Sequence, residues 1–242
     1  MRITSPVLLL LISAALAGCQ SSPDEPCGLG PAPDAPGFAE HNARRAEENK
    51  RNGFERVCKA NLERYDVSSD FVPLQRATEK LAFKPVDLAA TPLAQYQALG
   101  GMMETVSGVP SRLYRGFRTP QGHVLTLFEH DMSADGTLAY RAPADEPERI
   151  NGMAARLVVL EAGSGEAVSV LSWQEGRRYY ELWLDKNAAR LQLKPQLIAL
   201  AAALPKSIPA KTDEPARAPI TLGPDGRPNV PPPPLTLPAD QP

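Results

Sequence analysis

Residues 154–185 read AARLVVLEAGSGEAVSVLSWQEGRRYYELWLD, and this stretch decides the fold class. It contains three runs in which apolar and other side chains tend to alternate, and glycine-containing turns separate them. The runs are Ala154–Glu161, Ala167–Gln174 and Arg177–Asp185. Alternation with a period of two, broken by short glycine turns, predicts three consecutive antiparallel strands.

The flanking sequence extends this pattern on both sides. Arg112–Arg118 and His123–His130 read as two further strands, and Thr119-Pro120-Gln121-Gly122 between them is a typical hairpin turn. After the last strand, leucine and alanine recur at helical spacing between residues 191 and 204. We therefore expect an α+β fold: an antiparallel sheet of about five strands packed by a C-terminal helix, with N-terminal helices and a disordered tail.

The region before the sheet predicts less regular structure. Phe38–Tyr65 is a helical candidate whose second half, from Phe54, carries an apolar stripe. Phe83–Val86 reads as extended, because Pro85 disfavours the helical conformation at the residue before it. Leu93–Thr105 is a further helical candidate, weakened by Gly100-Gly101.

The start of the chain has the layout of a secretory signal peptide. A positive residue, Arg2, precedes the apolar run Val7–Leu16, which is about half the length that a membrane-spanning helix needs. The run ends in Leu16-Ala17-Gly18-Cys19, which resembles the lipobox of bacterial lipoproteins. The resemblance implies cleavage before Cys19 and lipid on that cysteine. Ala15-Leu16-Ala17 leaves open plain secretion with a free Cys19.

The resemblance also implies an address. In Gram-negative lipoproteins, aspartate after the lipidated cysteine retains the protein in the inner membrane, whereas Gln20 follows here. We therefore expect an outer-membrane lipoprotein that faces the periplasm. Three fatty chains on Cys19 would make the membrane anchor effectively permanent.

The 26 prolines help to divide the chain, because they crowd the segment after Cys19 and the C-terminal end. Composition and pattern together predict five parts, in which the neck and tail bury too little apolar surface to fold. These parts are a signal peptide (1–18), a flexible neck (19–37), a mostly helical segment (38–110), the antiparallel sheet plus helix (111–205) and a Pro-rich disordered tail (206–242).

Two cysteines remain once Cys19 carries lipid. Cys27 and Cys58 form an even pair in an oxidising compartment, which favours a disulfide between the neck and the first helical region. The alternative is a buried, free Cys58 with Cys27 exposed. Two isolated cysteines lack the spacing of a metal site.

No catalytic pattern is found in the sequence. It has no nucleophile elbow, phosphate-binding loop or zinc-protease motif, so we expect no catalytic residue, no cofactor, no metal and no enzyme activity. His123, Glu129, His130 and Asp131 lie close in sequence, but a strand would divide them between its two faces, and we expect solvated groups at a sheet edge. Arg115 is likewise expected on a surface strand. A net charge of −2 gives no support for nucleic-acid binding.

The stretch from Ile150-Asn151-Gly152 to Leu204 resembles the sheet-plus-helix domain in the periplasmic regions of some anti-sigma factors and related lipoproteins. The likeness rests on Trp173 at a strand end, the Glu175-Gly176 turn and the closing helix, and Phe83–Val86 matches the extended segment that opens that domain. It implies a non-catalytic sensing or interaction role, and it assigns no functional residue.

We therefore expect a lipid-anchored, periplasm-facing protein that binds another envelope component. The alternative is a carrier or chaperone for lipid or another apolar ligand. Tyr179 and Trp183 share one face of their strand, so that face is either a ligand or partner surface or is covered by the Phe54–Tyr65 stripe.

Overall fold

A computed structural model of the chain describes residues 34–139 and 143–211. The chain divides into two units, residues 1–42 and residues 43–242. Helix α1 (Phe38–Asn52) runs across this division and buries none of its residues. In the described part of the chain, no helix has both the length and the apolar character that crossing a membrane requires.

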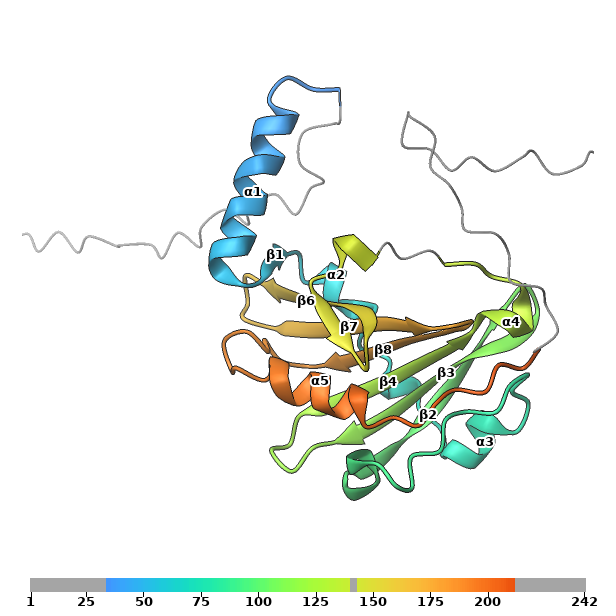
Figure 1. Cartoon of the computed structure of the whole chain (residues 1–242). Coiled ribbons are helices and arrows are strands. Elements are labelled where there is room, and N and C mark those ends of the chain that lie inside the picture. The colour runs from blue at the N-terminus through green and yellow to red at the C-terminus, as the bar shows by residue number, and fades with distance from the viewer. Residues whose placement is uncertain (1–33, 140–142, 212–242) are drawn as a thin grey trace, which may run out of the picture. The chain divides into compact units, whose positions relative to one another are not determined.

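The second unit is built on an eight-stranded sheet, shown in Figure 1. The strands lie in the order β1-β6-β7-β8-β4-β3-β2, and β5 also pairs with β6. All pairs are antiparallel except β1, which is parallel to β6. The strands are β1 (Glu55–Val57), β2 (Gln97–Val106), β3 (Val109–Arg118), β4 (Val124–Asp131), β5 (Glu148–Ile150), β6 (Met153–Ala162), β7 (Ala167–Glu175) and β8 (Arg178–Leu184).

The α+β class is confirmed, and all five strands expected from the sequence are present. The expected number of strands was wrong, because β1, β2 and β5 join the sheet as well. The predicted hairpin turn at Thr119–Gly122 is confirmed by a bond from the Gly122 N–H to the Thr119 carbonyl, at 2.9 Å. Asn151 and Gly152, both with positive φ, form the two-residue turn between β5 and β6.

Helix α5 (Lys194–Ala202) covers one face of the sheet, as the apolar spacing predicted (Figure 1). Pro195 lies in its first turn. On this face the Trp173 and Tyr180 rings stack with centroids 5.0 Å apart. The buried residues of this face and its cover include Leu125, Leu127, Leu171, Trp173, Tyr180, Leu182, Leu197, Leu200 and Ala201.

Residues 54–72 cover part of the opposite face. They contain β1, α2 (Ala60–Glu63) and a 3-10 turn at Ser68–Asp70, and their apolar side chains pack on the aromatic row of the sheet. Tyr65 meets Trp183 edge to face, with centroids 4.9 Å apart. Trp183 is consequently only 7% exposed. Of the two alternatives for this face, cover by the Phe54–Tyr65 stripe is confirmed for Val57, Leu62 and Tyr65, although the stripe is not one continuous helix.

Two glycines, Gly100 and Gly116, let residues 71 and 72 lie directly on the sheet. A Cβ atom on Gly116 would stand 2.0 Å from the Phe71 ring, and one on Gly100 would stand 2.4 Å from the Val72 carbonyl oxygen. Val72 and Gly101 exchange two backbone hydrogen bonds, both of 2.9 Å. The prediction of a helix over Leu93–Thr105 was therefore wrong: the Gly100-Gly101 pair serves a strand that another segment approaches closely.

The 38–110 segment is therefore less helical than expected. It contains β1 and β2, and after α3 (Leu74–Thr78) the chain forms neither helix nor strand through Phe83–Val86. The remaining helix of the unit is α4 (Met132–Asp135), and 3-10 turns lie at Pro92–Gln95 and Pro143–Asp145. The predicted signal peptide, most of the neck and residues 212–242 of the predicted tail lie outside the described residues.

Candidate functional site

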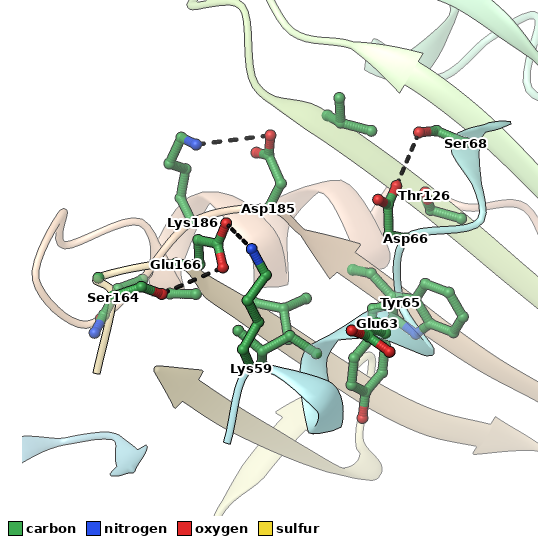
Figure 2. Close-up of a pocket in the computed structure, with 17 residues that line it drawn as sticks. Lys59, Glu63, Tyr65, Asp66, Ser68, Thr126, Ser164, Glu166, Asp185 and Lys186 are labelled. Carbon is green, nitrogen blue, oxygen red and sulfur yellow. Dashed lines mark hydrogen bonds and ion pairs between the residues drawn. The ribbon is translucent and has the colours of Figure 1, made fainter. Parts of the chain in front are cut away.

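A pocket of about 610 Å³ opens between residues 59–68 and the ends of β7 and β8, and Figure 2 shows the residues around it. It lies on the face of the sheet opposite helix α5. Seventeen residues line it, and most of them are polar or charged. They are Lys59, Leu62, Glu63, Tyr65, Asp66, Ser68, Val124, Thr126, Ser164, Gly165, Glu166, Ala167, Val168, Trp183, Asp185, Lys186 and Asn187.

The aromatic part of the lining is held in place by hydrogen bonds. The Trp183 ring N–H donates to Glu181 Oε2 at 2.6 Å, and the Tyr65 hydroxyl accepts from Arg64 Nη2 at 2.5 Å. Burial raises the pKa of Tyr65 above its ordinary value, so its hydroxyl is neutral at physiological pH. The pocket therefore offers rigid ring surface with neutral polar edges.

Four of the charged lining residues form two ion pairs, one of which joins separate segments of the chain (Figure 2). Lys59 Nζ lies 3.0 Å from Glu166 Oε1, which joins α2 to the β6–β7 turn. Ser164 Oγ donates to the second oxygen of Glu166, at 3.2 Å. The hydrogen bond from Lys59 lowers the pKa of Glu166. Lys186 Nζ lies 3.7 Å from Asp185 Oδ2, so this side of the pocket carries two adjacent pairs of opposite charge.

This arrangement can bind a ligand through charge and ring contacts. Exposed ion pairs such as Lys59–Glu166 are worth little on their own and open readily. A ligand that carries its own charged or hydrogen-bonding groups can therefore take over either partner. The Trp183 and Tyr65 rings supply apolar area beside these groups.

A second constellation lies on the α5 face of the sheet, where four charged side chains are almost completely buried. Arg115 is 5% exposed, and Glu129, Asp131 and Arg178 are 0% exposed. Glu129 bonds to Arg115 and, at 3.2 Å, to Arg178; Arg178 also bonds to Asp131 at 2.9 Å. The expectation that Arg115, Glu129 and Asp131 are solvated was wrong, because each charge is buried together with an opposite one.

This buried network holds residues 83–86 against the sheet. The Val86 N–H donates to Glu129 Oε2 at 3.0 Å, and Arg115 Nη1 donates to the Val86 carbonyl at 2.9 Å. The Phe83 ring lies over the Arg178 guanidinium, 4.3 Å from centroid to Cζ. The network therefore connects β3, β4 and β8 to a segment that pairs with no strand of the sheet.

Ser111, His130 and Asp135 meet beside α4, near the start of β3 and the end of β4. Ser111 Oγ donates to Asp135 Oδ2 at 2.5 Å, and His130 Nε2 lies 2.6 Å from the same oxygen. Burial alone would raise the pKa of Asp135, but hydrogen bonds from Ser111, Thr137 and His130 hold it well below its ordinary range. The serine and the histidine both bind the aspartate rather than each other, so this is not the order of a nucleophile–base relay.

The remaining predicted residues are not brought together. His123 is half-buried just before β4, and its backbone N–H donates to Thr119 Oγ1 at 3.1 Å. His130 is buried rather than solvated, contrary to expectation. Cys58 is half-buried, whereas Cys19 and Cys27 lie outside the described residues, so the lipid and disulfide remain predictions. Within residues 34–139 and 143–211, no group of three or more His, Cys, Asp or Glu residues is placed to hold a metal ion.

No protein-family model, curated protein or solved structure matches this chain.

Proposed function

We propose that this chain is a lipid-anchored protein of the Gram-negative outer membrane that faces the periplasm and has a non-catalytic binding role. Its lipid is carried on Cys19, and it binds another envelope component through the pocket between residues 59–68 and the β7–β8 end of the sheet. The Leu16–Cys19 lipobox and Gln20 support the location. No cofactor and no nucleic acid take part in the proposed role.

The pocket's charged pairs are the observation that carries the binding role. Lys59 and Glu166 lie 107 residues apart in sequence and meet at the rim of a pocket with Trp183 in its lining. Its seventeen lining residues include no histidine and no cysteine. The arrangement resembles a recognition surface, with rings for contact area and charges for orientation, more than a proton-transfer site.

The alternative, a carrier or chaperone for lipid or another apolar ligand, draws less support. Such a role needs a large apolar face or cavity. Here α5 covers one face of the sheet, residues 54–72 cover part of the other, and more than half of the residues that line the pocket are polar or charged. Native mass spectrometry of protein taken from cells distinguishes the two roles, because a co-purifying lipid would favour the carrier.

Photo-crosslinking in intact cells tests the binding role. A photo-reactive phenylalanine analogue replaces Glu63, which is exposed and lines the pocket. In a matched control it replaces Gln121, which is exposed in the β3–β4 turn. We expect a discrete adduct from position 63 and none from position 121. Equal labelling at both positions, or none at either, would contradict binding through this pocket.

Mass spectrometry tests the anchor separately. Protein extracted from membranes should begin at Cys19 and carry the mass of the attached fatty chains. An uncleaved Met1, or an unmodified N-terminus, would rule out the lipoprotein assignment without bearing on the pocket.

A further inference from the structure

Residues 207–211 lie across the ends of β4 and β8 and are held there through their main chain. In Figure 1 this segment is the orange trace that leaves α5 and runs toward α4. The Ser207 N–H donates to Glu175 Oε2 at 2.9 Å, and the Ile208 carbonyl accepts from Arg178 Nη2 at 2.8 Å. The Ala210 N–H donates to Asp131 Oδ2 at 2.9 Å, and the Lys211 N–H donates to Ser133 Oγ at 3.1 Å.

The side chains of this segment contribute little to its attachment. Ile208 is 62% exposed, and Ala210 and Lys211 are exposed as well. Lys211 Nζ lies 3.4 Å from the Ala134 carbonyl oxygen, and the side chains of Ser207 and Pro209 are half-buried. Four of the five residues are held through backbone atoms, and three of the five side chains are exposed, so we infer that the site recognises an extended main chain and tolerates varied sequence.

Two of the side chains that bond to this main chain, Asp131 and Arg178, also belong to the buried charge network. Asp131 and Arg178 are 0% exposed and Ser133 is 1% exposed. Asp131 Oδ1 accepts from the Ser133 N–H at 2.9 Å, while Oδ2 faces Arg178 and the Ala210 N–H. These side chains are therefore fixed in position before the segment arrives. Without it, the carboxylate and the guanidinium would each lose a buried partner, so an occupied site is strongly favoured.

We propose that Glu175, Arg178, Asp131 and Ser133 form a binding site for an extended polypeptide main chain. The chain's own residues 207–211 fill it in cis, and an extended segment of another polypeptide takes the same place when they are displaced. The site lies on the opposite face of the sheet from the pocket of Figure 2, and it does not depend on the proposed function.

The test uses the full chain with its own segment weakened. Ser207→Pro and Ala210→Pro together remove two of the three donated N–H groups. The matched control carries Lys206→Pro and Ile208→Pro, since the N–H groups of these two residues make no hydrogen bond within the described residues. A fluorescent peptide of residues 205–211 is the probe, and its anisotropy reports binding. The tethered segment acts at about millimolar effective concentration, so the wild-type chain should bind the probe weakly.

We expect the Ser207→Pro/Ala210→Pro chain to bind the probe at least about tenfold more tightly than the wild-type or control chain. A probe N-methylated at the Ala210 nitrogen should lose about tenfold or more, because it cannot donate to Asp131. A probe that keeps Pro209 but carries different side chains at the other positions should have an affinity within about threefold of that of the original probe. Equal binding of the methylated and unmethylated probes, or loss of binding with the exchanged side chains, would overturn the proposal.

A second measurement covers a variant that fails to fold. Wild-type chain is mixed with about millimolar photo-reactive probe and irradiated, and the crosslinked residues are mapped by mass spectrometry. The proposal requires adducts at residues 131–135 that the N-methylated probe does not give. Adducts scattered over the surface, or adducts independent of methylation, would overturn it.

Discussion

Glu129 is a fully buried carboxylate that bonds to Arg115, to Arg178 and to the Val86 N–H. In β4 it lies on the same face as the buried residues Leu125 and Leu127. The signal was present in the sequence: a charge on an apolar face predicts a buried charge with a partner. The sequence alone could not show that Arg178 is a partner of Glu129, because the two residues become neighbours only when β4 pairs with β8.

Replacing Glu129 with glutamine should destabilise the fold by about 3 kcal/mol, because it leaves two buried guanidinium groups with less opposite charge. Glu55→Gln is the control: its ion pair with Arg45 is about 40% exposed on both sides, and the change should cost less than about 1 kcal/mol. Urea unfolding of both variants measures the difference. Equal, small effects would mean that the buried charge contributes no more than a surface one.

Asp135 should make stability depend on acid pH. Its folded-state pKa is lowered, so its hydrogen bonds stabilise the fold fully above about pH 4 and are lost as pH falls below that value. The difference in unfolding free energy between wild type and Asp135→Asn should therefore be greatest near neutral pH and shrink below about pH 4. Ser111→Ala removes one of the bonds and should show an intermediate dependence. A difference that stays constant with pH would contradict this linkage.

At the scale of elements, local patterns predicted what local forces decide. Turn residues and alternation were enough to predict the β3–β4 hairpin and strands β6, β7 and β8. The spacing of leucines, together with Pro195, was enough to predict α5. Strand β2 was not predicted, because Gly100 and Gly101 weakened the pattern and their role depends on a distant segment. Gly100 makes room for Val72, which lies 28 residues earlier in the chain. Strands β1 and β5 have three residues each, too few for any period to be visible.

The crossing of Phe71 over Gly116 should be sensitive to a single methyl group. Gly116→Ala should cost about 1–3 kcal/mol, because its Cβ would overlap the Phe71 ring. In a Phe71→Ala background the same change should cost clearly less, which a double-mutant cycle measures. Gly163→Ala is the control, since no atom lies within 4 Å of its added Cβ. Additive effects of Gly116→Ala and Phe71→Ala would contradict the contact.

Helix α5 should stabilise the sheet through its buried leucines. Leu197 is 2% exposed, and Leu197→Ala should cost about 2–5 kcal/mol. Leu191, just before the helix, is 49% exposed, and Leu191→Ala should change stability by no more than about 0.5 kcal/mol. Thermal unfolding of the two variants compares them directly. Similar melting temperatures would mean that α5 is not part of the cooperative core.

At the scale of the whole molecule, the predicted Cys27–Cys58 disulfide would tie the neck to the segment that covers the aromatic face. We expect protein purified without reductant to resist thiol labelling at both residues, and to react at both after reduction and unfolding. Denaturation before labelling removes the effect of burial on Cys58, which is half-buried. Full labelling of both thiols in unreduced, denatured protein would exclude the disulfide and favour the free-thiol alternative.

The parallel pairing of β1 with β6 has a consequence for folding during synthesis, because β1 is made long before its partner strand. Glu55 faces Leu160, so a chain that emerges from its N-terminus exposes β1 for 105 residues before its partner exists. Lys59 and Tyr65 are separated from their partners Glu166 and Trp183 by even longer stretches of chain. Contacts of this separation slow folding, because a long loop must close before they form. A nascent chain that stops before Ala162 therefore keeps an unpaired strand and an uncovered apolar stripe, and such transiently exposed surface is prone to aggregation until the sheet is complete.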